Sequence, residues 1–412
     1  MGRAPNGGFG ASQLFQLLRD GEPRTRTELA AMTGLARSTI SIRIDELLDL
    51  GLVIPVGDAA STGGRPPAQV ALNPGARVVA AADLGATHAV VAITDLAGTV
   101  LCDIREKIEI ASGPDAVLEW LVVKIRTLLA ECGRAHVDLV AIGIGLPGPV
   151  EHESGKPTNP PIMPGWDNFD VPGRVRESFA VPVLVDNDVN IMALGERTVS
   201  WPAAEQMIFV KVSTGIGSGI ISGGALQRGA RGIAGDIGHV QIARGADVPC
   251  SCGNQGCLEA LAGSAAIIKS LREQGIAVNS VSELIALVKA GDITSIQAIR
   301  QAGRDIGEVL TTCVSIINPS LITIGGALAQ AGEHIIAGIR EVVYTRSTPF
   351  ATEHLSVMPS RAGERAGVIG ASIMATEEAL SQEGIESMAK RQRTDWKPRN
   401  PTTRDPEKSI RT

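Results

Sequence analysis

The sequence predicts an α/β protein made of an N-terminal winged helix-turn-helix unit, residues 9–72, and a larger two-lobed part, residues 78–379. The first observation behind this prediction is the helical spacing of apolar residues in the N-terminal unit, followed by two short strand-like stretches. The second is the alternation of strands and helices that begins near residue 78. The third is a pair of similar glycine-turn hairpins, residues 78–101 and 207–226, which indicates an internal repeat with a cleft between the lobes.

Charge and composition narrow the class of protein. The net charge of −6 gives no global indication of nucleic-acid binding, so such a role must depend on a local element. The N-terminus has no apolar signal segment, and no apolar run approaches the length of a membrane span. We therefore expect a cytoplasmic protein with no membrane partner, in which disulfides are not expected and clustered cysteines bind metal or react. Residues 387–412 are basic and proline-rich with little to bury, and we expect a disordered tail there.

The N-terminal unit has the residue spacing of a helix-turn-helix. Thr25 and Glu28 have capping-box spacing at the start of one helix. A second helix is expected at about 36–50, and Gly51 closes it. The apolar face of this second helix consists of Ile40, Ile44, Leu47 and Leu48. The stretch 52–72 can form a two-stranded wing, with Gly-Gly-Arg-Pro-Pro at or near its tip.

The second helix is the expected DNA-recognition helix, because its groove-facing side chains are basic or hydroxylated. The residues predicted to contact DNA are Arg37, Ser38, Thr39, Ser41 and Arg43 in the helix and Arg65 in the wing. Such side chains can reach base edges and phosphates from the major groove. The alternative is a three-helix protein-interaction unit. Local charge does not decide between the two, since residues 1–72 hold seven basic and seven acidic residues.

Three turns of the two-lobed part have the composition of nucleotide-binding turns. In the first hairpin, Gly85 lets the backbone approach a phosphate, Thr87 can donate to phosphate oxygens, and Asp83 can orient hydrated Mg²⁺. The second hairpin offers a phosphate cradle formed by Ser213, Thr214, Gly215 and Gly217. A third segment is a buried strand that ends in Gly325 and Gly326, suited to an adenosine lying on bare backbone. Together the three turns predict ATP and Mg²⁺ as candidate ligands.

A further strand, near residues 183–187, ends in Asn187 and Asp188 and leads into a helix. An acid at the carboxyl end of such a strand is placed for ligand chemistry. Asp188 can accept the proton of a hydroxyl that attacks a γ-phosphate. The alternative is that Asp188 only caps the following helix. The flanking phosphate turns favour the chemical role.

Three cysteines fall within eight residues and are preceded by a histidine. The set His239, Cys250, Cys252 and Cys257 has the composition of a closed, tetrahedral Cys₃His zinc site, which is structural rather than catalytic. The alternatives are a redox pair or inert buried thiols. The remaining cysteines, Cys102, Cys132 and Cys313, lie in apolar stretches and are expected to be plain core residues.

The segment from Val212 to His239 resembles the signature of the ROK family of repressors, open reading frames and sugar kinases. The match rests on Val-Ser-Thr-Gly-Ile-Gly-Ser-Gly-Ile, on the spacing of later glycines, and on the zinc motif Cys-Ser-Cys-Gly-Asn-Gln-Gly-Cys-Leu-Glu. The resemblance extends from the helix-turn-helix, typical of the repressor branch, to about residue 379. It implies a two-lobed, actin-like (ribonuclease-H-like) sugar-kinase fold with a zinc loop.

The resemblance also implies roles for individual residues. Asn187 and Asp188 would bind sugar hydroxyls, and Asp188 would be the base in an active kinase. His239 would bind zinc and help hold the sugar. The other residues implied to line the sugar pocket are Asp236, Glu259, Thr158, Asn159 and the turn at 145–149. Asp236 stands where the family has Glu, so the pocket is expected to prefer a different sugar or to bind it more weakly.

The favoured hypothesis is a sugar-responsive transcriptional regulator, most often a repressor, that binds operator DNA and senses a sugar or sugar phosphate. A homodimer or homotetramer would place two recognition helices on a palindromic operator. The alternative is an ATP-dependent hexose or N-acetylhexosamine kinase with Asp188 as general base. A third hypothesis is a domain that only oligomerises through its zinc loop.

Overall fold

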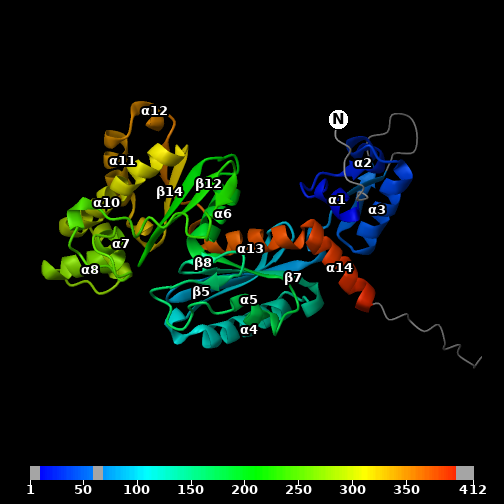
Figure 1. The fold of residues 1–412 in the computed structure, drawn as a ribbon, viewed down its shortest axis with the longest axis horizontal. Coiled ribbons are helices and arrows are strands. Elements are labelled where there is room, and N and C mark those ends of the chain that lie inside the picture. The colour runs from blue at the N-terminus through cyan, green and yellow to red at the C-terminus, as the bar shows by residue number, and fades with distance from the viewer. Residues whose placement is uncertain (1–9, 59–67, 396–412) are drawn as a thin grey trace, which may run out of the picture. The chain divides into compact units, whose positions relative to one another are not determined.

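The structure, a computed structural model, describes residues 10–58 and 68–395 (Figure 1). It divides into two compact units. One joins the N-terminal segment, up to Ala76, to the C-terminal segment from Glu378 onward, and the other spans Arg77–Glu377. Within the described ranges, no helix combines the length and the apolar character that crossing a bilayer requires.

The described part of the N-terminal segment contains three helices and a small sheet, and the two predicted helices and the two wing strands follow in the predicted order. The helices are α1 (Ala11–Gln16), α2 (Arg26–Thr33) and α3 (Arg37–Asp49), and the strands are β1 (Arg24–Thr25), β2 (Val53–Asp58) and β3 (Ala68–Leu72). The antiparallel sheet has the order β1-β3-β2. The predicted Gly-Gly-Arg-Pro-Pro tip, with Arg65, lies outside the described residues.

Local sequence explains where these helices begin and end. The Thr25 hydroxyl accepts a hydrogen bond from the Glu28 N–H, and the Glu28 carboxylate accepts one from the Thr25 N–H, which confirms the capping box. Gly34, with φ of 72°, ends α2 in the left-handed conformation that glycine tolerates. The fully buried side chains of Ile40, Ile44 and Leu47 turn one face of α3 toward the core.

The C-terminal segment corrects one prediction. Residues 387–395, expected to belong to a disordered tail, continue the helix α14 (Gln382–Asp395). Ile385 and Met388 are buried, and α14 packs against α1 in the same unit. The Gln16 side-chain amide also donates to the Leu380 carbonyl just before this helix. The prediction followed the basic composition of the segment and gave too little weight to these two apolar positions. They lie three residues apart and so give the helix one face to bury.

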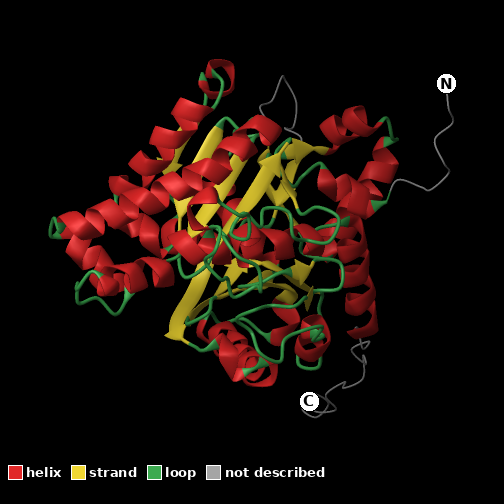
Figure 2. Cartoon of the chain, turned by 60° about the vertical axis from the view of Figure 1, so that its left-hand side comes forward, coloured by secondary structure: helices red, strands yellow, loops and turns green. Residues whose placement is uncertain are grey.

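The larger unit contains two lobes, each built on a sheet with the same strand order. Figure 2 shows the strands in yellow with helices around them. The first sheet runs β10-β7-β4-β5-β6 and the second β15-β14-β11-β12-β13. In each, three antiparallel strands from consecutive hairpins are followed by two parallel strands. The first-lobe strands are β4 (Val78–Leu84), β5 (His88–Asp95), β6 (Val100–Lys107), β7 (Leu139–Leu146) and β10 (Val183–Asn187). The second-lobe strands are β11 (Met207–Val212), β12 (Ile216–Ser222), β13 (Ala225–Gln227), β14 (Leu321–Gly325) and β15 (Ser356–Pro359). The internal repeat predicted from the two hairpins is confirmed.

Helices cover the sheets and bury one large apolar cluster in each lobe. The first lobe carries α4 (Pro114–Glu131), α5 (Val171–Arg176) and the short ribbon β8 (Val150–Glu151) with β9 (Lys156–Pro157). The second lobe carries α7 (Glu259–Ala262), α8 (Ser264–Glu273), α9 (Val281–Lys289), α10 (Ile293–Ile317), α11 (Glu333–Arg346) and α12 (Pro349–Thr352).

Two helices, α6 (Asp188–Ser200) and α13 (Ala366–Ala379), cross closely between the lobes. Glycines permit the crossing, because a Cβ at Gly370 would stand 1.7 Å from the Ile191 carbonyl oxygen and one at Gly195 would stand 2.0 Å from that of Ala366. Helix α6 contacts strands of both sheets. It therefore fixes the residues at its own N-terminus relative to both lobes.

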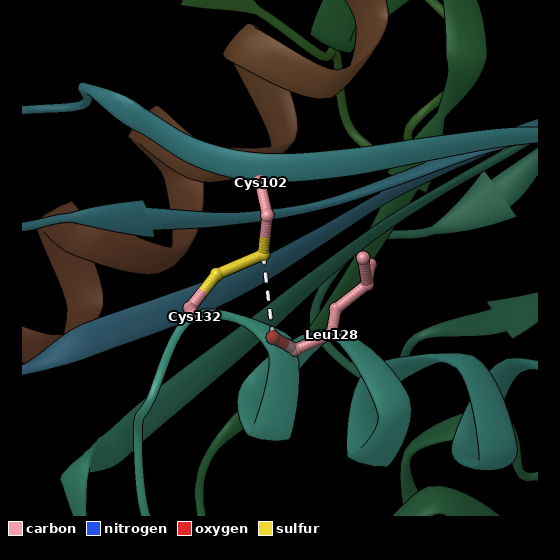
Figure 3. Close-up of a disulfide and its surroundings, with 3 residues drawn as sticks. All are labelled: Cys102, Leu128 and Cys132. Carbon is pink, nitrogen blue, oxygen red and sulfur yellow. Dashed lines mark hydrogen bonds between the residues drawn. A yellow bond between two sulfur atoms is a disulfide. The ribbon is translucent and has the colours of Figure 1, made fainter.

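Cys102 and Cys132 correct a second prediction. They form a disulfide between β6 and the end of α4, instead of standing as separate core thiols (Figure 3). Their Cα atoms are 6.3 Å apart, within the range that a disulfide spans. The Cys102 sulfur also lies 3.3 Å from the Leu128 carbonyl oxygen. Thirty residues separate the two cysteines in sequence, so only the packing of α4 on the sheet brings them together.

Candidate functional site

A cavity of about 430 Å³ lies between the two lobes and is lined from both. All the nucleotide-turn residues predicted from the sequence line it: Asp83, Gly85, Thr87, Ser213, Thr214, Gly215, Gly217, Gly325 and Gly326. So do Asn187, Asp188, Asp236, His239 and Glu259. The fold therefore gathers into one cleft predicted residues that lie up to 243 positions apart in the chain, from Asp83 to Gly326.

Two predicted residues are not among those that line the cavity. Thr158 and Asn159 are exposed, and their backbone N–H groups bond the Pro149 carbonyl and the Asp167 carboxylate. The same segment reaches the cavity two residues later, through Pro161 and Ile162. The predicted turn at 145–149 contributes Pro147, Gly148 and Pro149.

At the N-terminus of α6, the residue that caps the helix is not the residue predicted to act on the ligand. Asn187 is the N-cap residue, and its side-chain oxygen accepts a hydrogen bond from the Val189 N–H at 2.9 Å. Its amide nitrogen donates to the Gly148 carbonyl at 2.9 Å, which ties α6 to the turn of the first lobe. Because Asn187 caps the helix, Asp188 is not needed for that role. The capping alternative for Asp188 is therefore wrong.

Asp188 faces a lysine that the sequence analysis did not single out. Lys211 Nζ donates to Asp188 Oδ2, and both side chains line the cavity. The Asp188 side chain is only 4% exposed and that of Lys211 is 23% exposed. Burial by itself lowers the pKa of Lys211, but the Asp188 and Asp83 carboxylates outweigh it, so the pKa is raised overall.

Asp83, at the end of β4, belongs to the same charged group. Burial raises the pKa of the Asp83 carboxyl to about 6, an effect that Lys211 opposes and Asp188 reinforces. A Cβ at Gly367 of α13 would stand 2.1 Å from Asp83 Oδ2, so glycine there leaves the space that this carboxylate occupies. Burial, together with Arg105 and Lys211, lowers the pKa of the neighbouring His88.

The predicted metal ligands converge. His239, Cys250, Cys252 and Cys257 each offer one atom, and these atoms all lie within 4.8 Å of one another. The Cys252 and Cys257 sulfurs are 3.7 Å apart, as are the Cys250 sulfur and His239 Nδ1. Zn–S bonds of about 2.3 Å in a tetrahedron place two sulfurs about 3.8 Å apart. The donor set and its spacing therefore fit zinc, and Nδ1 is the ring nitrogen of His239 that lies near the Cys250 sulfur.

The loop that carries Cys250, Cys252 and Cys257, the cysteine loop, leads directly to the cavity. Glu259 begins α7 two residues after Cys257, and its Oε2 accepts a hydrogen bond from the Ile216 N–H at 3.0 Å. A side chain at Gly215 would begin 2.9 Å from that oxygen, so the glycine turn leaves room for the carboxylate. Gly235, with φ of 97°, packs against Ser218, which brings the neighbouring Asp236 to the cavity wall.

In the N-terminal unit, the predicted recognition helix exposes part of its predicted surface. Arg37 and Ser38 are exposed, while Thr39, Ser41 and Arg43 are half-buried. Arg43 is held by Glu46, with Nη1 2.9 Å from Oε1. Ile42 is 59% exposed and was missed by the sequence analysis. The signal was present, because Ile42 falls between the buried positions Ile40 and Ile44 and so points away from the core.

The comparisons with known proteins fit this arrangement. A family model described as ROK family matches residues 79–378. The chain belongs to the ROK family. A ROK relative, the xylose repressor of Bacillus spizizenii, is 30% identical over 370 residues, which are 89% of this chain and 94% of that protein.

Two solved ROK structures show how far the likeness extends. A ROK family transcriptional regulator, described as a homolog of the E. coli MLC protein, has a TM-score of 0.77 and 25% identity, covering 92% of this chain and 98% of its own. A ROK hexokinase from Thermus thermophilus has a TM-score of 0.63 and 30% identity, covering 73% of this chain and 99% of its own. The sugar-kinase-like part of the ROK fold, with its two mixed sheets, is thus shared with regulators and with an enzyme.

Proposed function

We propose that this ROK protein is a sugar-responsive transcriptional repressor. One observation carries the proposal: the chain aligns with repressors over nearly its whole length, whereas a complete kinase of the family covers only 73% of it. Residues 79–378, matched by the family model, make up about that share. The N-terminal unit is therefore what this chain has in addition to a kinase-like cleft.

DNA binding is assigned to α3. The residues proposed to face the operator are Arg37, Ser38, Thr39, Ser41, Ile42 and Arg43, with Arg65 of the wing. Arginine and hydroxyl groups suit base edges and phosphates, and an apolar side chain such as Ile42 suits a thymine methyl group. A homodimer would present two such helices to the two halves of a palindromic site in the cytoplasm.

The cleft is assigned to the sugar. Asn187, Asp188, Asp236, His239 and Glu259 present amide, imidazole and carboxylate groups of the kind that bind sugar hydroxyls. Zinc, held by His239 and the three cysteines, would fix the loop that carries Glu259, with no coordination position left for catalysis. A sugar regulates DNA binding only if it binds the two conformations of the protein with different affinities.

The test is fluorescence anisotropy with DNA from upstream of the protein's own gene, with and without a panel of sugars and sugar phosphates. Arg37→Ala should weaken specific binding about 10-fold or more, since a good base contact contributes about 1–3 kcal/mol. Lys269→Ala, an exposed basic residue of α8 in the other unit, is the matched control and should leave binding unchanged. One sugar should release the wild-type protein. Equal binding by the wild-type protein and Arg37→Ala would refute the assignment of α3.

A further inference from the structure

The residue with the least expected position in the cleft is Lys211. It is the only charged side chain of β11, between Val210 and Val212, which are fully buried. Its Nζ donates to Asp188 Oδ2 and acts electrostatically on Asp83, which lies in the other lobe. An ammonium group therefore stands among the carboxylates that the sequence assigned to catalysis and to Mg²⁺.

Phosphoryl transfer makes two demands on these carboxylates. A base must be free to accept the hydroxyl proton, and a divalent cation must be free to bind beside the phosphates. A lysine ammonium is a single positive charge that stays fixed to the chain. Hydrogen-bonded to Asp188, it occupies an oxygen that would accept the proton. Asp83 lines the same cavity and is also affected by the Lys211 charge, so the ammonium repels a second cation from this space.

The charges on the cavity wall also bear on the ligand. Five carboxylates line the cavity, from Asp83, Asp188, Asp236, Glu259 and Glu364, against one lysine and one arginine, Lys211 and Arg105. Arg105 is itself paired with Glu364, and Lys211 with Asp188. The lysine and the arginine of the wall are thus each paired with a carboxylate. Such a wall favours a neutral ligand over a phosphorylated one.

We propose that the Lys211 ammonium, paired with Asp188 in the cavity that Asp83 also lines, takes the place of a divalent metal ion there. The cleft would then bind a neutral, unphosphorylated sugar without Mg²⁺ and ATP. This inference rests on the proposed function, because it names the class of ligand that the cleft senses. It also gives the reason why a kinase-like cleft acts as a sensor.

The first experiment measures Mn²⁺ binding by electron paramagnetic resonance, with Mg²⁺ as competitor, on zinc-loaded full-length protein. The wild-type protein and Lys211→Arg, which keeps the charge, should bind no Mn²⁺ in the cleft. Lys211→Met should bind Mn²⁺ at least about 10-fold more tightly than wild type, because two carboxylates are left without a cation. Adding Asp83→Asn to Lys211→Met should abolish that gain.

Two results would overturn the cation assignment. One is Mn²⁺ binding by the wild-type protein that Asp83→Asn removes, and the other is a folded Lys211→Met variant that binds no more Mn²⁺ than wild type. Circular dichroism checks folding. If Lys211→Met does not fold, Lys211→Gln, which keeps a hydrogen bond to Asp188, replaces it in the same comparison.

The second experiment tests the ligand class by calorimetry in buffer without Mg²⁺ or ATP. D-xylose, D-glucose and N-acetyl-D-glucosamine are compared with their phosphates, and a free sugar should bind. Binding of phosphates alone, or ATP turnover that Asp188→Asn abolishes, would overturn the proposal. Mn²⁺ binding requires neither sugar nor DNA. Failure of every sugar to affect DNA binding would therefore count against the proposed function and not against the cation assignment.

Discussion

Glu259 accepts a hydrogen bond from the backbone N–H of Ile216 at 3.0 Å, and this bond joins the cysteine loop to the glycine turn of β12. The Glu259 carboxylate, which we propose binds the sugar, is thus held by the loop on one side and by a strand on the other. Changes in the loop should therefore affect ligand binding as well as local folding.

The first prediction concerns this loop. Cys252→Ser should remove zinc and lower sugar affinity about 10-fold or more, because loss of groups that orient a site commonly has effects of that size. Metal content by mass spectrometry and calorimetry with the sugar measure the two effects. Cys313→Ala, a free cysteine of α10 outside the loop, is the control and should keep both. Full zinc content in Cys252→Ser would contradict the ligand assignment.

The second prediction concerns the pH dependence of stability. The Asp83 pKa is about 6 in the folded protein and near 3.8 when unfolded, so the folded state holds this proton more tightly. Stability contributed by the protonated carboxyl is complete below about pH 4 and is lost as pH rises toward 6. Asp83→Asn does not lose this stability with pH, because an amide does not ionise. As pH rises between these values, the free energy of unfolding of the variant should therefore increase relative to that of wild type, by at most about 3 kcal/mol.

Urea unfolding of both proteins at several pH values between 4 and 8 measures that difference. The gain should be half complete near pH 5 and constant above pH 7. A difference that does not change with pH would show that Asp83 titrates normally in the folded protein.

The third prediction concerns the disulfide. Without reductant, denatured protein treated with a zinc chelator should show four reactive thiols, because Cys102 and Cys132 are joined and four cysteines are free. Reduction should lower the free energy of unfolding by up to about 3–4 kcal/mol, the loop-closure value for a separation of this length. The Cys102→Ser/Cys132→Ser variant should have the stability of the reduced wild-type protein, both with and without reductant. Six reactive thiols in oxidised protein would refute the bond.

The fourth prediction concerns α14. A chain ending at Ser381 loses the buried side chains of Ile385 and Met388, and the unit that contains α1 should lose about 3–6 kcal/mol of stability. The DNA affinity of the truncated chain should fall as the stability of this unit falls. A chain ending at Asp395 keeps the helix and is the matched control. Thermal melts and anisotropy compare the two, and equal behaviour would mean that α14 does not support this unit.

Local signals in the sequence predicted much of the fold. The capping box at Thr25 and the left-handed glycine at Gly34 act within a few residues, so they could be read directly. The two hairpins predicted the repeat because each is formed by adjacent strands. The nucleotide-turn residues of the cleft followed from glycine turns at strand ends, and all of those turns reach the cavity. Asp236 and Glu259 were implied only by the family resemblance.

What the sequence did not predict depends on contacts between distant residues. Cys102 meets Cys132 only when α4 packs on the sheet, and Lys211 meets Asp188 only across the cleft. Thr158 and Asn159 were assigned by resemblance, and the path of their loop places its later residues at the cavity instead. In α14 the apolar residues were few, and their partner helix lies near the other end of the chain.

The repeated strand order has one more consequence. Two walls built on sheets with the same strand order would not by themselves set the orientation of a small ligand. Among the described residues, however, the cysteine loop interrupts only the second lobe, between β13 and α7, and Glu259 follows directly from it. This asymmetry would give a bound sugar one orientation, and we expect a stoichiometry of one sugar per chain. A dimer bound to one palindromic operator would then bind two sugar molecules.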